Sequence, residues 1–455
     1  MKNEASATLA MEQNKKWMVR WIMGLAENAA NGWDRPGGIS GILKIPVPYL
    51  TTTIMHTTRA RCFPALFMIA AAAAGAAPAL TSPVANDSHE SPTTVPAVGP
   101  ADPDITRALE SILEKRKIPG MAAGIADAHG LVAYGVAGVR ARENPAKVQE
   151  NDRFHLGSCT KSMNATMIAT LVEEGKLSWS TTVGEAFPTL RDGMDPAWRG
   201  VTLEQLLTNR SGAPNQMNAN GLWGKLASFK GSPTDARRAL VEGVTKNPPE
   251  VAPGSKFIYS NAGFSIAGAM AETITKIPWE DLMRRRIFEP LGMTTAGFGA
   301  PGHAGTVDEP RGHQQTSPVT PGPGADNPEA ISPAGRVHCS IGDWAKYVAL
   351  HLRAGEVSGG LPTILKPATF AKLHAPAKGS DNEYAMGWGV AERGWAGGRV
   401  LTHSGSNTMW FCVTWLAPKK QFAVLVACNE AGPDAEAGCD EACGALIQTH
   451  EKQGR

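Results

Sequence analysis

Apolar positions recur with two spacings from about residue 104 onward, and these spacings divide the chain into helices and strands. Apolar residues spaced three or four positions apart predict helices. These helices are expected at 104–120, from Ser158, and at 201–214, 234–246, 263–276, 279–287, 342–356 and 434–450. Shorter apolar runs between turn residues predict strands, two within 121–141 around Ala128-His129-Gly130, then 384–392, 399–406, 409–418 and 421–430. Strands at both ends with helices between them indicate an α+β fold, an antiparallel sheet flanked by helices and carrying a mostly helical inserted domain.

This organisation predicts one globular region over 104–450. Its sheet part is expected at about 104–157 and 331–450, and its helical part at about 158–330, with the longest Pro/Gly-rich loop at 300–330. No internal repeat is visible in the sequence. No segment after the N-terminal region is apolar over the roughly 20 residues that a membrane-spanning helix needs.

The N-terminal region has a different character. Arg59 and Arg61 precede an apolar run over 63–77 and the small-residue stretch Ala77-Pro78-Ala79, which is the layout of a secretory signal peptide over 55–79. A buried helix is the alternative, less consistent with the Pro/Ser/Thr-rich stretch behind it. We therefore expect residues 1–54 to be a non-native extension before a start at Met55, residues 80–103 to be a disordered leader, and the mature protein to be periplasmic or secreted.

Composition narrows the classes of function. The 455 residues carry a formal net charge of +2 and 42% hydrophobic residues, and the scattered basic residues form no stripe for nucleic acid. Six cysteines follow the signal segment, without a zinc-ligand spacing. Cys428 is a candidate for a disulfide with Cys439 or Cys443, because export permits disulfides; free buried thiols are the open alternative.

Ser158 and Lys161 are the first candidates for chemistry. Lys161 shares a helix face with Ala165, Ile168 and Val172, so a charged residue is placed on the buried side of a core helix. In one interpretation Ser158 is an ordinary N-cap and Lys161 extends to water along its aliphatic stem. In the other, residues i and i+3 meet on the helix surface, and a desolvated lysine helps to deprotonate a serine nucleophile.

Two further short stretches carry polar residues with a regular spacing. "FIYSNAGF" places Tyr259 and Asn261 two residues apart, and an extended backbone would point both side chains to the same side. "LTHSGSN" places His403, Ser404 and Gly405 in a predicted strand, where glycine permits close approach of another backbone or a ligand. Taken singly, each is more often an ordinary strand residue.

The order and spacing of the three motifs resemble the serine β-lactamase and penicillin-binding superfamily. The resemblance is to its class C β-lactamase-related branch, which includes β-lactamases, D-Ala-D-Ala carboxypeptidases, D-aminopeptidases and carboxylesterases. Stretches such as "FHLGSCTKSMNATMIATLVEEGKLSW", "VTLEQLLTNRSGAP" and "PAGRVHCSIGDWAKYV" are similar to that branch as well, and the resemblance covers essentially all of 104–445. It implies a class C β-lactamase or DD-peptidase-like fold.

The resemblance also implies roles for the residues. Ser158 would be the acylated nucleophile, and Lys161 and Tyr259 would share the base role, the phenol having a lowered pKa. Asn261 would orient the substrate amide or the lysine, and His403, Ser404 and Gly405 would line the substrate site. The backbone N–H groups of Ser158 and Ser406 would form the oxyanion hole. No metal or cofactor is implied.

One residue departs from the β-lactamase pattern, because class C β-lactamases usually carry lysine where His403 stands. The histidine either holds a substrate carboxylate as a cation or shapes the strand and its hydrogen bonds. The sequence thus predicts a secreted serine hydrolase that acts through an acyl-enzyme on an ester, a β-lactam or a peptidoglycan-type D-amino-acid peptide. The alternative is a non-catalytic penicillin- or peptidoglycan-binding sensor that uses the same pocket.

Overall fold

The computed structural model describes residues 99–356, 361–378 and 383–454. The predicted N-terminal extension, the signal peptide and the leader up to residue 98 lie outside the described residues. The leader was predicted to extend to residue 103, but its end belongs to the fold. The Asp102 carboxylate accepts hydrogen bonds from the N–H groups of Asp104 and Ile105 and so caps helix α2 (Pro103–Arg116), and its own N–H donates to Tyr134 O at 2.7 Å.

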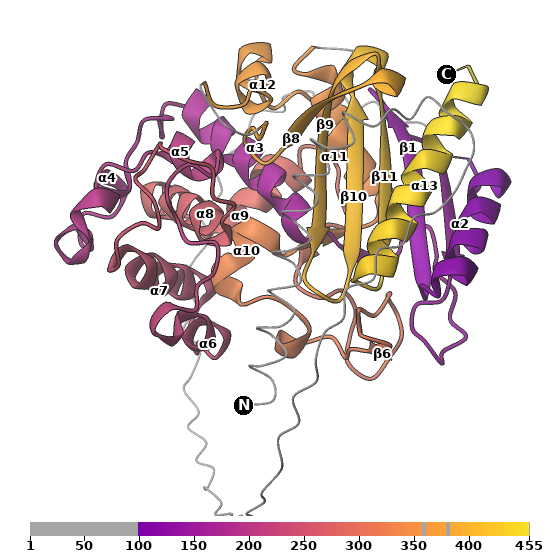
Figure 1. Cartoon of the computed structure of the whole chain (residues 1–455), viewed down its shortest axis with the longest axis horizontal. Helices are drawn as coiled ribbons and strands as arrows, with labels where there is room; N and C mark the ends of the chain where they lie inside the picture. Colours follow the sequence, from indigo (N-terminus) through magenta and orange to yellow (C-terminus); the bar gives the residue numbers. More distant parts are fainter. Residues whose placement is uncertain (1–98, 357–360, 379–382, 455) are drawn as a thin grey trace, which may run out of the picture. The chain divides into compact units, whose positions relative to one another are not determined.

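The centre of the fold is a six-stranded antiparallel sheet with the order β2-β1-β11-β10-β9-β8 (Figure 1). Its strands are β1 (Gly120–Asp127), β2 (Gly130–Gly138), β8 (Gly389–Arg393), β9 (Gly398–Ser406), β10 (Phe411–Ala417) and β11 (Phe422–Cys428). The first and last strands of the chain are neighbours, with Met121 opposite Cys428. The two ends of the described chain therefore build one sheet.

Helices cover both faces of this sheet. Side chains alternate between the faces along a strand, so the apolar strands have buried residues on each face. Met121 and Val424 belong to a core cluster with α2 and the C-terminal helix α13 (Pro433–Lys452), and Figure 1 shows these two helices on one face. Ala122 and Leu425 belong to the larger cluster on the other face, which includes α11 (Ile341–Arg353).

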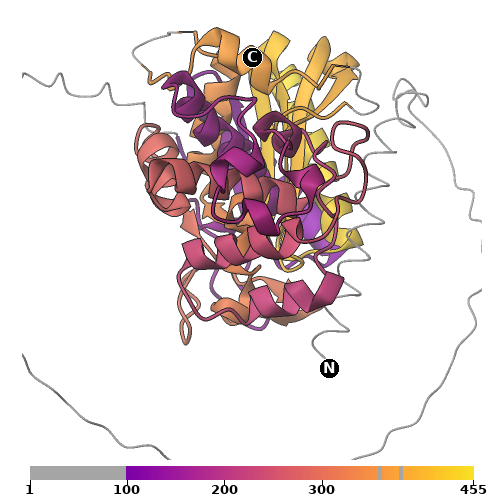
Figure 2. The same cartoon turned by 90° about the vertical axis from the view of Figure 1, so that its left-hand side faces the viewer.

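The helical part lies beside the sheet (Figures 1 and 2), and in the chain it falls between the 3₁₀ turn η1 (Gly157–Cys159) and strand β7 (Val337–Cys339). Its helical elements are α3 (Thr160–Glu173), α4 (Val183–Ala186), α5 (Leu203–Leu207), α6 (Leu222–Ala227), α7 (Pro233–Thr245), α8 (Asn261–Thr275), α9 (Trp279–Met283), the π-helical turn η5 (Arg284–Phe288) and α10 (Ser332–Gly335). The sheet and the helices share one hydrophobic cluster. The predicted α+β fold is confirmed, while the boundaries drawn between its two parts stay predictions.

Short elements complete the fold. They are a three-stranded sheet of β3 (Phe154–His155), β7 (Val337–Cys339) and β4 (Gly297–Phe298), the hairpin of β5 (His313–Gln314) and β6 (Ser317–Pro318), and helix α12 (Pro367–Leu373). Among the described residues, no helix is both long and apolar enough to cross a membrane.

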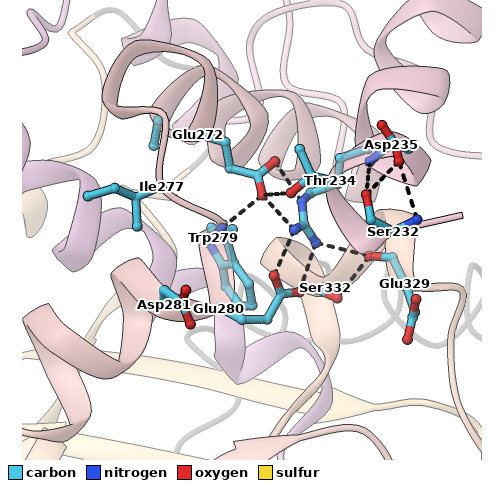
Figure 3. Close-up of polar contacts among 12 residues, drawn as sticks. Ser232, Thr234, Asp235, Glu272, Ile277, Trp279, Glu280, Asp281, Glu329 and Ser332 are labelled. Atoms are coloured by element: carbon cyan, nitrogen blue, oxygen red, sulfur yellow. Dashed lines mark hydrogen bonds and ion pairs between the residues drawn. The ribbon is translucent and has the colours of Figure 1, made fainter. Parts of the chain in front are cut away.

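A buried ion cluster joins three helices of the helical part (Figure 3). The Arg237 side chain on α7 is 0% exposed, and its guanidinium lies 2.6 Å from Glu272 Oε1 on α8 and 2.7 Å from Glu280 Oε2 on α9. It also donates to Glu329 O at 3.3 Å, which accepts a second hydrogen bond from Ser332 Oγ at 2.8 Å. The cluster thereby fixes the segment that leads into α10.

Two sequence-based expectations need correction. The predicted strand 384–392 is a strand only from Gly389, because Gly387 has φ 82° and packs where a Cβ would lie 2.5 Å from the Ser162 backbone. The cysteines of the described residues are free and buried, although the Sγ atoms of Cys428 and Cys439 lie 3.6 Å apart. The structure therefore has free thiols, the alternative left open by the sequence, in place of the candidate disulfide of Cys428 with Cys439 or Cys443.

Candidate active site

Ser158 lies at the junction of the sheet and the helical part. It occupies the middle of a 3₁₀ turn, η1 (Gly157–Cys159), directly before α3. No side chain caps α3, so the interpretation of Ser158 as an ordinary N-cap is wrong. The serine is half-buried and its hydroxyl is in contact with Lys161.

Lys161 does not extend to water, because its side chain is 0% exposed. Its Nζ lies 3.0 Å from Ser158 Oγ, 2.7 Å from Asn261 Oδ1 and 2.8 Å from Ala334 O. The oxygens of Asn261 and Ala334 accept hydrogen bonds. A neutral amine has two N–H bonds and one lone pair, so donating to these two oxygens leaves the lone pair for the Ser158 hydroxyl.

The electrostatics of the site favour that neutral amine. Burial lowers the pKa of Lys161 well below its ordinary value of 10.5, because removal from water disfavours the charged form. The nearest aromatic ring, that of Tyr259, has its centroid 4.7 Å from Nζ. Ser158 and Lys161 therefore form a nucleophile with an adjacent base.

Tyr259 and Asn261 reach the same site from one segment, but not as residues of a strand. Tyr259 and Ser260 precede α8, Ser260 caps that helix, and Asn261 is its first residue. Instead of two residues of one extended segment, Tyr259 lies in the connection before α8 and Asn261 begins the helix. Both side chains still approach Lys161.

The predicted lowering of the Tyr259 pKa is contradicted by its surroundings. The side chain is 8% exposed, and burial raises the pKa of the phenol more than the neighbouring Ser158 hydroxyl lowers it. The buried Tyr259 hydroxyl has no hydrogen bond of normal geometry to any described residue. A neutral Tyr259 hydroxyl is placed to donate a proton or a hydrogen bond, whereas Lys161 is the better base.

His403 lies on β9 and is 3% exposed. Its Nδ1 lies 2.5 Å from Ser404 O, which can only accept, so Nδ1 carries the proton. Its Nε2 then accepts from the Tyr384 hydroxyl at 3.1 Å. Burial is the largest cause that lowers the pKa of His403, to about 3. The histidine is therefore neutral near pH 7, which favours a role in the hydrogen-bond network over a cation for a carboxylate.

Two glycines, Gly157 and Gly405, lie where the two backbone segments of the predicted oxyanion hole approach each other. A Cβ at Gly405 on β9 would overlap Leu156 O and lie 2.8 Å from Ser158 N, and a Cβ at Gly157, with φ 46°, would overlap Ser406 N. The absence of both side chains lets the backbones approach closely. The close approach places the backbone nitrogens of Ser158 and Ser406 near each other, and their role as an oxyanion hole stays a prediction.

Two contacts at the site were missed from the sequence. Tyr384 was assigned only to a predicted strand, and Ala334 was given no role, although it lies in the stretch "PAGRVHCSIGDWAKYV" that resembles the family. Only the "Y-x-x-G-W-G" pattern of 384–389 sets Tyr384 apart in the sequence. Within the described ranges, no group of three or more His, Cys, Asp or Glu residues is arranged to hold a metal.

Known proteins resemble this chain in sequence. The chain is 27% identical over 345 residues to the unguisins hydrolase ungD' of Aspergillus campestris (72% of this chain, 62% of the relative), and 26% identical over 297 residues to penicillin-binding protein 4 of Amycolatopsis lactamdurans (63% and 73%). It spans only 62% and 45% of the length of two fungal hydrolases that it matches.

Solved structures share the fold. The β-lactamase/D-alanine carboxypeptidase of Pseudomonas syringae superposes with a TM-score of 0.61 at 18% identity, covering 76% of this chain and 98% of that one. The octameric penicillin-binding protein homologue of Pyrococcus abyssi gives a TM-score of 0.60 at 22% identity, covering 77% of each chain. A family model described as Beta-lactamase matches residues 105–443. The chain therefore belongs to the Beta-lactamase family, within the superfamily of serine β-lactamases and penicillin-binding proteins.

Proposed function

We propose that this protein hydrolyses a neutral ester or amide through an acyl-enzyme on Ser158, as an esterase-like member of the class C-related branch. The observation that carries the proposal is the buried amine of Lys161. It donates to two acceptor oxygens, which leaves its lone pair for the Ser158 hydroxyl, whose Oγ lies 3.0 Å away. A sensor that only binds ligand has no need of a neutral lysine at this place.

The reaction follows from these contacts. Lys161 Nζ takes the hydroxyl proton as Ser158 Oγ forms a bond to the substrate carbonyl carbon. The carbonyl oxygen becomes an oxyanion between the N–H groups of Ser158 and Ser406. Its collapse breaks the bond to the leaving group, which receives a proton from Lys161 or the Tyr259 hydroxyl. Water then attacks the acyl-enzyme by the reverse use of the same groups, which frees the acid and Ser158.

The preference for neutral substrates rests on His403. Class C β-lactamases usually carry a lysine at this position, and a charged lysine can hold a substrate carboxylate. Here a neutral imidazole occupies the position, already bonded to Tyr384 and Ser404. Substrates whose binding depends on a cation at this point are therefore expected to be poor, β-lactams and D-Ala-D-Ala peptides among them.

Covalent labelling tests the acyl-enzyme. A fluorophosphonate or a fluorescent penicillin should label the wild type, and Ser158→Ala should lose the label while its circular dichroism spectrum stays unchanged. Turnover of p-nitrophenyl esters, nitrocefin and a D-Ala-D-Ala peptide should rank the ester first. Labelling of Ser158→Ala at the wild-type level would contradict the proposal.

We also propose that the protein is exported by the segment 55–79. The support is its basic start, short apolar run and small-residue end. Expression from Met55 in a Gram-negative host should give periplasmic protein that begins near Leu80. Mass spectrometry that finds residues 1–54 on exported protein would contradict this proposal.

A further inference from the structure

A buried carboxylate lies beside the oxyanion hole, in the long loop for which the sequence showed no motif. Asp326 follows the turn η6 (Pro323–Ala325), and its side chain is 1% exposed. Its Oδ1 accepts from the Asn327 N–H at 2.7 Å, and its Oδ2 accepts from Arg336 Nε at 3.1 Å. The remaining contacts of this carboxylate lead to the two walls of the predicted oxyanion hole, which are the backbone segments that carry the Ser158 and Ser406 N–H groups.

The first wall is reached through His155. Its side chain is 0% exposed, and its Nε2 lies 2.9 Å from Asp326 Oδ1. On the other side of the ring, Nδ1 accepts the N–H of Gly157 at 3.1 Å. A backbone N–H can only donate, so Nδ1 is the acceptor and the ring proton is on Nε2, which lies near the carboxylate at an angle that misses normal hydrogen-bond geometry. The imidazole thus connects Asp326 to the residue before Ser158.

The second wall is reached through Asn407. Its Nδ2 lies 3.3 Å from Asp326 Oδ1 and 3.4 Å from Ala325 O. Its Oδ1 accepts the N–H groups of Met409 and Trp410, both at 3.2 Å. Asn407 is 4% exposed and directly follows Ser406. The same carboxylate oxygen therefore contacts the side chains that hold both sides of the hole.

We infer that Asp326, with His155 and Asn407, is a positioning group that sets the spacing of the Ser158 and Ser406 N–H groups for the oxyanion. The inference rests on the proposed acyl-enzyme, because only a developing oxyanion needs that spacing. His155 and Asp326 do not form a second nucleophile-activating pair, since Nδ1 faces a backbone N–H and not a hydroxyl. Their action on catalysis passes through the backbone.

The charge of Asp326 is retained at neutral pH. Burial by itself raises the pKa of the carboxyl, but His155, Arg336 and the Asn327 N–H outweigh that effect and lower the pKa to about 2. An amide in its place cannot accept at both ends. Its NH₂ group would face the donors of either Arg336 or His155 and Asn407, and the two walls would shift relative to each other.

The test compares Asp326→Asn and His155→Gln with wild type, using p-nitrophenyl acetate as substrate and phenylboronic acid as a transition-state analogue. The glutamine amide can still reach Asp326 but leaves the Gly157 N–H without its acceptor. For each variant kcat should fall about tenfold or more, since loss of an oxyanion donor costs about 10²–10³ and misalignment is a partial loss. KM should stay within about twofold, and the boronate Ki should rise by the same factor as kcat falls.

The control is Asp343→Asn, which removes another buried carboxylate, bonded to Thr295 and Lys346 at the start of α11. It should lower Tm while leaving kcat and the boronate Ki within about twofold. Variants at 326 and 155 that behave like this control would overturn the inference and leave the proposed function intact. If Asp326→Asn does not fold, His155→Gln decides. A wild type without Ser158-dependent turnover would contradict both the inference and the proposed function.

Discussion

At the scale of single residues, the site depends on what burial does to ionisable groups. A lysine in water is a cation and a poor base near pH 7. The same side chain at 0% exposure, beside two carbonyl oxygens and the Ser158 hydroxyl, has a lowered pKa. Tyr259 experiences the same burial, but because its charged form is the anion, its pKa is raised. One environment therefore separates a base from a proton donor.

The first prediction concerns Lys161. If its neutral amine is the base, kcat/KM for an ester rises with pH as the proton leaves Nζ and then levels off. The midpoint should lie below 10.5, because burial lowers the pKa of this group. Lys161→Arg should reduce kcat by about 10²–10⁴, since a guanidinium stays protonated. The matched control Lys176→Arg, at an exposed lysine after the same helix, should be unchanged. A full-activity Lys161→Arg would exclude the lysine as base.

The second prediction concerns His403. With a pKa of about 3, the imidazole is neutral from pH 6 to 8. The KM of a carboxylate-bearing ester should therefore change with pH over that range in the same way as the KM of a neutral ester. Paired KM profiles on wild type measure this. A KM that rises only for the carboxylate substrate would show a cationic His403 and would contradict the preference for neutral substrates.

At the scale of elements, a buried helix and a buried ion cluster hold the helical part together. Helix α3 is buried from Thr160 to Leu171, which explains why its sequence is apolar on several sides. The cluster around Arg237 joins α7, α8 and α9 to the segment before α10. Since Ala334 of α10 accepts from Lys161, this cluster also supports the site from a distance.

The third prediction follows from that cluster. Arg237→Met leaves Glu272 and Glu280 without their buried cation and should lower the free energy of unfolding by about 3–5 kcal/mol. Lys246→Met, at the C-cap of the same helix, breaks an exposed i,i+4 pair with Glu242 and should cost under about 0.5 kcal/mol. Urea unfolding of both variants measures the difference. Equal effects would mean that the buried cluster contributes no more than a surface pair.

At the scale of the whole molecule, the site exists only because segments far apart in the chain meet. Ser158, Asn261, Ala334 and Ser406 come from a turn, two helices and a strand. The tightest of these meetings is between the backbones of 156–158 and 405–406, where neither Gly157 nor Gly405 has room for a Cβ.

The fourth prediction tests that meeting. Gly405→Ala should force the two backbones apart, lower the free energy of unfolding by about 1–3 kcal/mol and reduce kcat strongly. Gly444→Ala in α13 is the matched control, because nothing lies within 4 Å of its Cβ position. That change should stabilise the protein by up to about 1 kcal/mol without affecting kcat. A Gly405→Ala enzyme with wild-type kcat would contradict the close approach.

Local pattern determined much of this protein. Periodicity predicted the sheet strands and most helices, since burial of one face leaves a repeat in the sequence. The order and spacing of three motifs, through their resemblance to a known superfamily, predicted Ser158, Lys161, Tyr259 and Asn261 as site residues. The sequence also carried His403 and Gly405 in a strand. Tyr384 was visible only as part of a predicted strand, and Asp326 only as one residue in a loop. Their partners lie 19 and 171 residues away in the chain, and such pairings leave no local repeat.

Only the tertiary structure decided the charge states. Whether Lys161 is a base, Tyr259 an acid and His403 a neutral imidazole depends on removal from water by residues distant in sequence. Residue type sets the ordinary pKa, but desolvation and neighbouring charges move it. Those neighbours are assembled by the fold, so the sequence determined which groups are present and the packing determined what each can do.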